Sequence, residues 1–427
     1  MSYIRVVLYK VQKNINYIMV DITKNIVHNG SNIYTCVAGI KLWVSSEADR
    51  EYLLWTNMII HYGGHMKKNE IIHSKKWVFI VSVIVLVILA FVSTSYIFVK
   101  SYITKMNIIT TNDLEDGLNI ESDIEEVVDP EEISEGPDSK KEEIDLIESR
   151  IRSNMENNST SIVSDKNVCN ILLIGSDTRS KDDRGRSDAM IVVSINKKTK
   201  KIVATSILRD IYIKIPGKEK NNRINTAYAN GGAKLLMDTI KQNFKIDIDR
   251  YVSINFFAFM DVIDSVGGVN INVKQEEIKV MNDYIKGQNI LLNDDEDKDI
   301  IIEAGEYNLN GKQALGYARN RYVGTDFERT ARQRRVLEQV FNKVKGLNII
   351  ELNDLLNIIL PQVTTNLTEG EIFSLILGLP SYGKYSLEQW SIPVHGSYQF
   401  LRIRGMDVIG IDFEKNIQEI LTRIYGY

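Results

Sequence analysis

Five charged residues flank three apolar runs in the second half of the chain: Asp177, Arg179, Asp188, Arg209 and Asp210. The runs, 168–174, 189–195 and 202–208, are short and aliphatic and are separated by turn residues, which predicts three strands. Short connections favour antiparallel pairing, in which the end of the first strand, the start of the second and the end of the third share one edge of the sheet. The sequence therefore predicts that carboxylates and guanidinium groups meet at this edge.

A second polar group surrounds a predicted helix that begins near Asp326: Arg319, Arg321, Arg329, Arg332 and Gln333. Arg329 and Gln333 are four residues apart and therefore share one face of this helix. Cations at a helix N-terminus oppose the helix dipole, so their presence there favours a bound anion. Solvated arginines and a nucleic-acid site are the alternatives. The further arginines at the strand edge argue against the first, and the extracellular location predicted below argues against the second.

These residue types suit a diphosphate site. The planar arginine fork binds phosphate oxygens through two hydrogen bonds. A pair of carboxylates that also uses waters and phosphate oxygens is a common way of holding magnesium. Phosphoryl transfer needs charge neutralisation and positioning more than a protein nucleophile. The sequence has neither a P-loop nor a dinucleotide-binding glycine motif, so nucleotides are not favoured.

The composition is that of a globular protein without a strongly basic balance. The 427 residues carry a net charge of -4 at pH 7, with 44% hydrophobic and 25% charged residues. No nucleic-acid partner is expected, because such proteins usually show a basic domain or stripe. His395 is the one histidine that follows the long apolar segment of the sequence, which argues against a histidine triad or a histidine-rich metal site in the main domain.

Residues 77–99 form an uninterrupted apolar run, against the roughly 20 residues that a bilayer-crossing helix needs. We expect an uncleaved transmembrane helix. The alternative, a signal peptide, would have a shorter apolar region and an A-x-A cleavage site. Lysines precede the run and the chain turns acidic after it, so 66–76 is predicted to be a cytoplasmic stub. The protein is then a single-pass protein of the cell membrane, with its N-terminus in the cytoplasm and its catalytic domain outside.

Two segments flank this predicted anchor. Residues 1–65 show no clear period, and the codons of Gly63-Gly64 can spell a ribosome-binding site just before Met66. We therefore predict that Met66 is the native start and that 1–65 come from an over-extended reading frame; a real cytoplasmic extension is the alternative. Residues 100–167 are crowded with Asp and Glu and are predicted to form an acidic extracellular linker, with at most a transient helix over 142–155.

Residues 168–427 are predicted to form the extracellular catalytic domain. Beyond the three strands, the sequence predicts a helix ending near Phe244, a strand over 251–255, a helix over 256–266, a strand over 269–273, an exposed acidic loop over 282–299, a helix opened by a capping box at Thr368, and a closing helix over 412–425. Phe256, Phe257 and Phe259 are predicted to be core residues first, with a lipid pocket as the alternative.

From Asn170 onward the chain resembles the LytR-CpsA-Psr (LCP) family of bacterial envelope proteins. The motifs occur in the family's order: Gly175-Ser-Asp177-x-Arg179, Arg186-Ser-Asp188, Ser206-Ile-Leu-Arg209-Asp210, Arg223-Ile-Asn-Thr-Ala-Tyr228, Asp264-Ser-Val-Gly267-Gly268, Leu309-Asn-Gly311 with Tyr317-Ala-Arg319-Asn-Arg321, and Asp326-Phe-Glu-Arg329-Thr-Ala-Arg332-Gln333. The ordered set is far more specific than any one motif. Two positions depart from the family pattern: Leu208 stands where proline is usual, and Arg223 replaces the usual lysine.

The resemblance implies an α/β fold in which a central mixed sheet carries helices on both faces, with a pocket for a polyprenyl tail. It implies a phosphotransferase that moves a glycopolymer, such as a teichoic acid or a capsular or secondary wall polysaccharide, from a polyprenyl-diphosphate carrier to peptidoglycan. By motif position, Asp177 and Asp188 would bind Mg²⁺ (or Mn²⁺). The residues expected to bind the diphosphate are Arg179, Arg209, Arg319, Arg321, Arg329, Arg332 and Gln333. Asp210 is expected to orient an arginine or to accept the acceptor's proton, which makes Asp177, Asp188, Arg209 and Asp210 the candidate catalytic residues.

Two functions from other classes compete with this expectation. A membrane-bound transcriptional regulator would act through its cytoplasmic part, but 66–76 is too short to bind DNA specifically and 1–65 shows no convincing helix-turn-helix. A non-catalytic polyprenyl-lipid binding protein would need the pocket and the arginines but not the acidic pair. A transfer assay with a polyprenyl-diphosphate-linked oligosaccharide and peptidoglycan separates the three.

Overall fold

The computed structural model describes residues 2–8, 15–29, 33–46, 52–60, 100–109, 136–156, 161–176, 187–320 and 322–427. The predicted membrane span 77–99 therefore lies outside the described residues, as do three predicted site residues, Asp177, Arg179 and Arg321. Within the described ranges, no helix is both long and apolar enough to cross a membrane.

The chain divides into two compact units, Met1–Thr94 and Ser95–Tyr427. The first contains a four-stranded antiparallel sheet in chain order: β1 (Ser2–Leu8), β2 (Ile15–Asn29), β3 (Ile33–Ser46) and β4 (Tyr52–Ile60). Whether 1–65 belongs to the native protein stays a prediction about the start codon.

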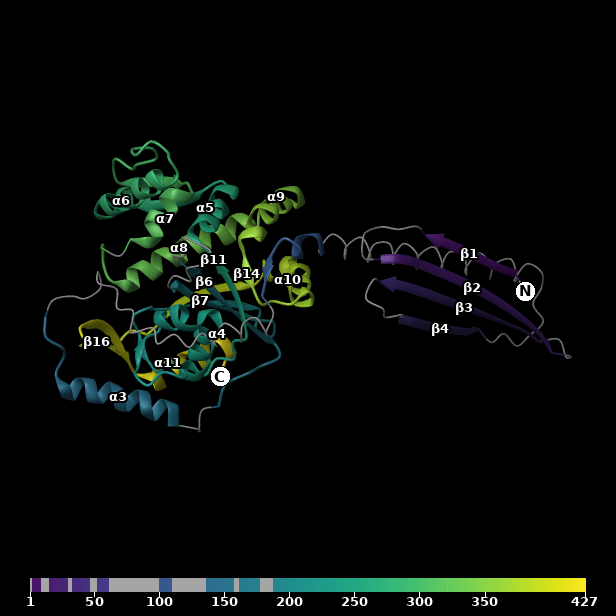
Figure 1. Ribbon diagram of the computed structural model, residues 1–427, viewed down its shortest axis with the longest axis horizontal. Helices are drawn as coiled ribbons and strands as arrows, with labels where there is room; N and C mark the ends of the chain where they lie inside the picture. The colour runs from purple at the N-terminus through teal and green to yellow at the C-terminus, as the bar shows by residue number, and fades with distance from the viewer. Residues whose placement is uncertain are drawn as a thin grey trace. The chain divides into compact units, whose positions relative to one another are not determined.

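A seven-stranded mixed sheet is the centre of the second unit (Figure 1). Its strands, in spatial order, are β15 (Ser386–Ile392), β8 (Lys201–Ile207), β7 (Ser187–Asn196), β6 (Val168–Ser176), β11 (Arg250–Ile254), β14 (Thr364–Thr365) and β5 (Asn107–Ile108). β6, β7 and β8 pair antiparallel, as their short connections predicted, whereas β15 pairs parallel to β8 and β11 parallel to β6. The mixed sheet expected from the family resemblance is therefore confirmed.

Helices cover both faces of this sheet (Figure 1). One side carries α3 (Lys141–Glu156), α4 (Asn225–Phe244) and α11 (Phe413–Ile420), and the other carries α5 (Phe256–Ser265), α6 (Gln275–Leu291), α7 (Gly311–Arg319), α8 (Asp326–Val344) and α9 (Ile349–Ile359). α10 (Glu369–Tyr382) follows β14 and begins at the predicted capping box of Thr368 and Glu371. Three two-stranded antiparallel sheets complete the unit: β9 (Tyr212–Ile213) with β10 (Asn222–Arg223), β12 (Val269–Val273) with β13 (Gly305–Leu309), and β16 (Tyr398–Ile403) with β17 (Met406–Ile411).

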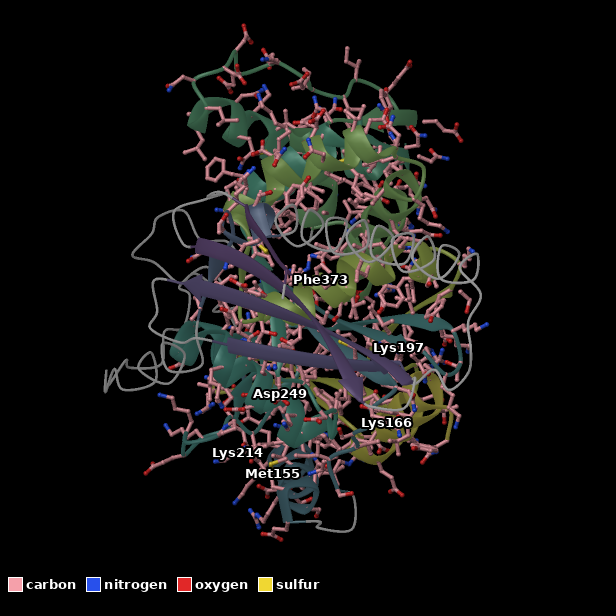
Figure 2. All side chains as sticks on the ribbon, turned by 90° about the vertical axis from the view of Figure 1, so that its right-hand side faces the viewer. Met155, Lys166, Lys197, Lys214, Asp249 and Phe373 are labelled. Carbon is pink, nitrogen blue, oxygen red and sulfur yellow. The ribbon has the colours of Figure 1, made fainter. Side chains whose placement is uncertain are left out.

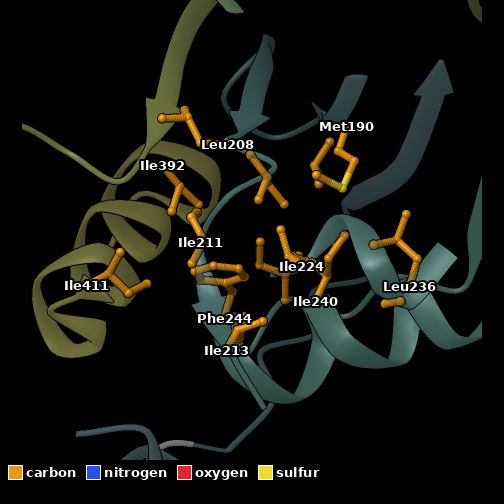
Figure 3. Close-up of a cluster of buried hydrophobic side chains, with 14 of the residues drawn as sticks. Met190, Leu208, Ile211, Ile213, Ile224, Leu236, Ile240, Phe244, Ile392 and Ile411 are labelled. Atoms are coloured by element: carbon orange, nitrogen blue, oxygen red, sulfur yellow. The ribbon is translucent and has the colours of Figure 1, made fainter. Parts of the chain in front are cut away.

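The main core lies between the sheet and α4 (Figure 3). Met190 and Val192 of β7 alternate toward it, because successive strand residues point to opposite faces. Leu208, which stands where the family usually has proline, is completely buried in this core. Its burial explains how the turn after β8 stays anchored without a proline. A smaller core, which includes Ile263 and Val336, joins α5 through α8 to the β12–β13 sheet.

The prediction of a solvated linker is wrong for 136–156. Its residues 141–156 form α3, whose Ile147 and Ile151 are buried in the main core. Glu148 accepts hydrogen bonds from Tyr212 Oη at 2.9 Å and from Asn221 Nδ2 at 2.6 Å. The acidic composition hid an apolar stripe that repeats every three or four residues, and such a stripe packs well once another surface is available.

The acidic loop was also predicted too early in the chain. α6 continues to Leu291, so the first ten residues of the predicted loop 282–299 are helical. Its Ile285 is fully buried and Asn289 donates hydrogen bonds to the carbonyl oxygens of Glu296 and Lys298. Other polar residues of this helix, among them Lys279 and Asp283, are exposed and give the sequence a loop-like composition.

Candidate active site

The predicted convergence at one edge of the sheet is confirmed for Asp188, Arg209 and Asp210, the three of its five residues that the structure describes. The last residue of β6, Ser176, pairs with Ser187 at the start of β7, and β8 ends close to this edge, at Ile207. Asp188 is therefore the second residue of β7, and Arg209 and Asp210 follow β8. Side chains separated by twenty residues in sequence thus lie within ion-pair distance, because strand pairing brings these termini together.

Arg209 is the centre of an ionic network. Its Nη1 lies 3.5 Å from Asp188 Oδ1, and its Nε lies 3.5 Å from Asp210 Oδ1 and 4.0 Å from Asp326 Oδ1. Asp326, at the start of α8, also pairs with Arg329 Nη2 at 2.5 Å. The Arg209 side chain is only 11% exposed, so these charges interact with little solvent screening.

Asp210 contacts Arg209 but lines neither of the two cavities described below. Burial raises the pKa of this carboxyl, Arg209 counteracts the rise, and the nearby Asp326 carboxylate adds to it. Its Oδ1 is also 3.7 Å from Nη1 of the buried Arg223, the position where the family usually has lysine. Asp210 lines neither of the cavities described below, so of its two predicted roles the geometry favours orienting arginines.

A small cavity of about 20 Å³ lies next to this network. Its lining comes from β7, α6, α7 and α8: Asp188, Tyr284, Arg319, Arg329 and Gln333. Four of these five residues were predicted to act together from separate motifs, and the structure brings them together. Their roles in binding and catalysis stay predictions.

Arg319 is held between two aromatic rings. Its guanidinium carbon lies 4.1 Å from the ring centre of Phe256 and 4.9 Å from that of Tyr284, distances typical of cation–π contacts. The α7 helix that carries Arg319 packs closely on α5, since a Cβ on Gly311 would lie 2.5 Å from the carbonyl oxygen of Met260. Glycine at this position therefore permits the approach that brings Arg319 over Phe256.

A larger cavity of about 260 Å³ adjoins the small one and shares Tyr284 and Arg319 with it. Phe256, Phe257 and Leu291 supply apolar lining, whereas Asp283 and Gln288 supply polar lining. Phe259 instead packs against the smaller core. Of the two alternatives that the sequence left open, Phe256 and Phe257 therefore fit a pocket lining, and Phe259 fits a core position.

Arg332 does not join the predicted diphosphate group. Its side chain is 3% exposed, and its Nη1 pairs with Glu277 Oε1 at 3.2 Å. Its Nη2 donates to the carbonyl oxygens of Asn320 and Val323. Three residues after Arg329, it points to another side of α8 and fixes the turn that precedes the helix.

Two residues of the site carried no predicted role. Tyr284 fell within the range predicted to be an exposed loop, and Asp326 was treated only as a helix start. The apolar residues of 275–291 repeat with helical spacing. This spacing would have predicted a helix in which Tyr284 lies on the same face as the buried Ile278 and Met281, one turn further along. No local signal identifies Asp326 as a partner of Arg209, because the two are joined only by tertiary structure.

Asp188 is the one predicted magnesium ligand that the structure describes. The described residues contain no group of three metal-ligating side chains. This pattern still fits a magnesium ion that binds diphosphate, which usually takes one or two carboxylates and completes its shell with phosphate oxygens and water. Asp188 borders the arginine-lined cavity, where phosphate oxygens would be available.

The chain resembles known proteins over most of its second unit. It is 31% identical over 268 residues to the polyisoprenyl-teichoic acid--peptidoglycan teichoic acid transferase TagU of Enterococcus faecalis, which covers 61% of this chain and 79% of that protein. It is 33% identical over 219 residues to the TagU transferase of Bacillus mycoides, covering 51% and 66% of the two chains. The crystal structure of protein gbs0355 from Streptococcus agalactiae matches with a TM-score of 0.52 and 26% identity, over 61% of this chain and 89% of that one. The LytR_cpsA_psr family model matches residues 137–422, and the chain therefore belongs to the LytR_cpsA_psr family.

Proposed function

We propose that this protein transfers a glycopolymer from a polyprenyl-diphosphate carrier to peptidoglycan. The observation that carries the proposal is the meeting of Asp188, Arg319, Arg329 and Gln333 around one cavity beside Arg209. The curated relatives named as teichoic acid transferases support both the lipid-linked donor and the peptidoglycan acceptor. Mass spectrometry of the lipid that copurifies with the protein would identify the glycopolymer.

The reaction is an exchange at phosphorus. A peptidoglycan hydroxyl oxygen forms a bond to the phosphorus that bears the glycopolymer, the bond from this phosphorus to the bridging oxygen of the carrier breaks, and polyprenyl phosphate leaves. The hydroxyl proton passes to solvent or to a carboxylate of the site. Arg319 and Arg329 bind the diphosphate oxygens and stabilise the charge that develops, while Asp210 orients Arg209.

The metal is part of the proposal. Asp177 and Asp188 would hold Mg²⁺ (or Mn²⁺), which would neutralise charge on the diphosphate. Asp188 Oδ1 lies 3.5 Å from Arg209 Nη1, so the proposed metal ligand and a proposed diphosphate-binding arginine are neighbours. Mass spectrometry of the native complex with a prenyl diphosphate, with and without chelator, tests metal occupancy independently of activity.

The apolar part of the larger cavity is proposed to take the first isoprene units of the carrier. Phe256, Phe257 and Leu291 line the side of this cavity, and Arg319 stands between it and the small cavity. Arg319 therefore lies where the charged head of a prenyl diphosphate would meet the part of its tail that contacts Phe256, Phe257 and Leu291.

We propose the membrane topology expected from the sequence, with 77–99 as the span, 66–76 in the cytoplasm and the LCP domain outside. The lysines before the span support this orientation. Protease added to intact cells is expected to digest 168–427 and to leave 66–76 protected. Peptides from 2–65 in the native protein, read by mass spectrometry, would contradict a start at Met66.

The transfer assay is the test of function. Purified full-length protein is incubated with a polyprenyl-diphosphate-linked oligosaccharide and peptidoglycan, and the attached glycan is quantified. Arg209→Ala is expected to lower the rate about 10²- to 10³-fold, as the loss of one transition-state donor does elsewhere. Asp188→Ala is also expected to lower the rate, because it removes a proposed metal ligand and the carboxylate that faces Arg209. Arg152→Ala on the exposed side of α3 is the matched control. Unchanged transfer in both site variants refutes the mechanism, and lipid binding without transfer by the wild type identifies a carrier.

A further inference from the structure

The end of the sheet opposite the candidate active site carries an excess of exposed lysines. It is formed by the start of β6, the turn between β7 and β8, the start of β11 and the start of α10. The exposed lysines there are Lys166, Lys197, Lys198, Lys200 and Lys384. In the described part of the chain, none of the five has a carboxylate oxygen within 4.0 Å.

Most of the neighbouring carboxylates pair with other cations, whereas Asp165 lies near Lys166 and Lys198 and offsets part of their charge. Glu371 pairs with Arg250 at 2.8 Å, and Glu388 pairs with both Lys201 and Arg423. Lys100 lies 3.9 Å from Glu369. These pairs add no net negative charge, so the five lysines outweigh Asp165 and leave a positive surface.

The same end of the sheet exposes apolar helix surface. α10 is apolar along most of its length, yet only Ile372 is buried, and Leu377 is 62% exposed. Phe373, Leu375 and Ile376 are half-buried. A helix with apolar residues on most sides is normally covered by protein or lipid. Figure 2 labels Phe373, Lys197 and Lys166 on the side of the domain that it views.

The residues that follow the predicted span pack against α10 and the residues just before it: Ile103 contacts Leu367 and Ile372. Tyr102 is only three residues after Val99, a reach of about 10 Å at most, and its side chain is buried. Tyr102 Oη donates to Asn353 Oδ1 at 2.5 Å, and Lys105 Nζ donates to Asn357 Oδ1 at 2.6 Å, both on α9. β5 then adds to the sheet beside β14. The headgroup layer is about 5–8 Å thick on each side of a bilayer, so this attachment leaves little room between bilayer and domain.

We propose that the lysine surface and α10 form a membrane-facing surface that docks on the anionic bilayer carrying the protein's own span. The proposal rests on the single-span topology proposed above. The lysines bind anionic headgroups, and Leu377 and Phe373 reach the acyl boundary. β6 has nine residues at about 3.3 Å each, so the candidate active site stands roughly 25–30 Å above the headgroups. The diphosphate is therefore handled away from the bilayer surface, nearer to the acceptor polymer.

The test is lipid photocrosslinking in the full-length protein, reconstituted in phosphatidylcholine bilayers with and without phosphatidylglycerol. A photoreactive phenylalanine analogue replaces Leu377, Phe400 or Ile290, which are 62%, 63% and 63% exposed. Phe400 lies on β16 and Ile290 near the end of α6, on other parts of the domain (Figure 1). Lipid adducts are expected at 377 and not at the other two positions. Equal yields at all three, or adducts at 290 alone, overturn the proposal.

Charge reversal tests the lysines separately. Lys166→Glu, Lys197→Glu and Lys198→Glu together are expected to lower the adduct yield at 377 on the order of 100-fold in bilayers with phosphatidylglycerol, because each of the three lysines contributes about five-fold to binding at an anionic surface. Reversal of Lys140, Lys141 and Lys279, which are exposed elsewhere, is the control. An unchanged yield in the first variant refutes the electrostatic part.

Failure of the proposal is distinguishable from failure of the proposed function. If transfer activity is intact and 377 gives no lipid adducts, the membrane-facing surface is wrong and the transferase remains. If carbonate extracts the wild-type chain from bilayers, the single-span premise is false and the proposal falls with it.

Discussion

Replacing Arg332 by methionine tests whether this arginine is structural. The substitution preserves the apolar stem but leaves Glu277 charged and the carbonyl oxygens of Asn320 and Val323 without their donor. Both side chains of the ion pair are nearly buried, at 3% and 4% exposure. Removing one partner of a buried pair costs about 3–5 kcal/mol. At about 2–4 °C per kcal/mol for a domain of this size, the midpoint of unfolding, Tm, should fall by roughly 6–20 °C.

Thermal unfolding of the purified full-length protein measures this fall. Glu277→Gln and the double variant complete a mutant cycle. Because the two side chains contact each other, the double variant should lose less stability than the two single variants together, with a coupling on the order of 1–3 kcal/mol. Gln333→Leu on the same helix is the control, since Gln333 lines the small cavity and is expected to affect ligand binding more than Tm.

The contrary result is equally clear. If Arg332→Met kept the wild-type Tm and lost the stabilisation that a short prenyl diphosphate confers, Arg332 would bind the ligand, as its motif position predicts. The contacts of its guanidinium with Glu277 and with the turn would then not describe the state that acts on substrate.

Three further predictions concern the site and its support. Tyr284→Leu removes one of the two rings that contact the Arg319 guanidinium. A cation–π contact contributes roughly 0.5–1 kcal/mol, so KM for the lipid-linked donor should rise about two- to five-fold. Steady-state assays should show kcat nearly unchanged. Burial raises the pKa of the Asp210 carboxyl above that of an ordinary aspartate. Protonation of this carboxyl removes the negative charge that faces Arg209. Transfer activity should therefore fall as the pH drops through the raised pKa. A pH–rate profile measures this. Ile147→Ala empties a fully buried position under α3 and should cost about 2–4 kcal/mol, measured as a lower urea midpoint.

Each of these has a control. Tyr284→Phe keeps the ring and should restore KM; a KM as high as that of the leucine variant would contradict the stacking argument. Asp210→Asn should lose the acidic limb of the profile, and an unchanged limb would exclude Asp210 as its source. Leu146 is next to Ile147 but 46% exposed, so Leu146→Ala should leave the urea midpoint nearly unchanged. A fall in the midpoint equal to that of Ile147→Ala would contradict the burial of Ile147 in the core.

The three central strands could be predicted because their signals are local. β-branched runs with turn residues between them specify strands, and short connections specify antiparallel neighbours, so the meeting of Asp188 with Arg209 followed from sequence. α3 and the second half of α6 were underestimated for the opposite reason. Their polar faces dominate the composition, and their apolar stripes matter only when a partner surface is present, as it is for Ile147 and Ile285.

The sequence by itself determined the residue types of the site and the strand edge that presents them, because motif order and strand alternation are properties of the chain. Only the tertiary structure decided which arginines face the cavity. Arg329 and Arg332 lie three positions apart on one helix, and packing turns the first toward Asp188 and buries the second against Glu277. Tyr284 likewise becomes part of the site through the packing of α6 on α7. Such distinctions depend on which helix face meets which neighbour, and that information is spread over contacts distant in sequence.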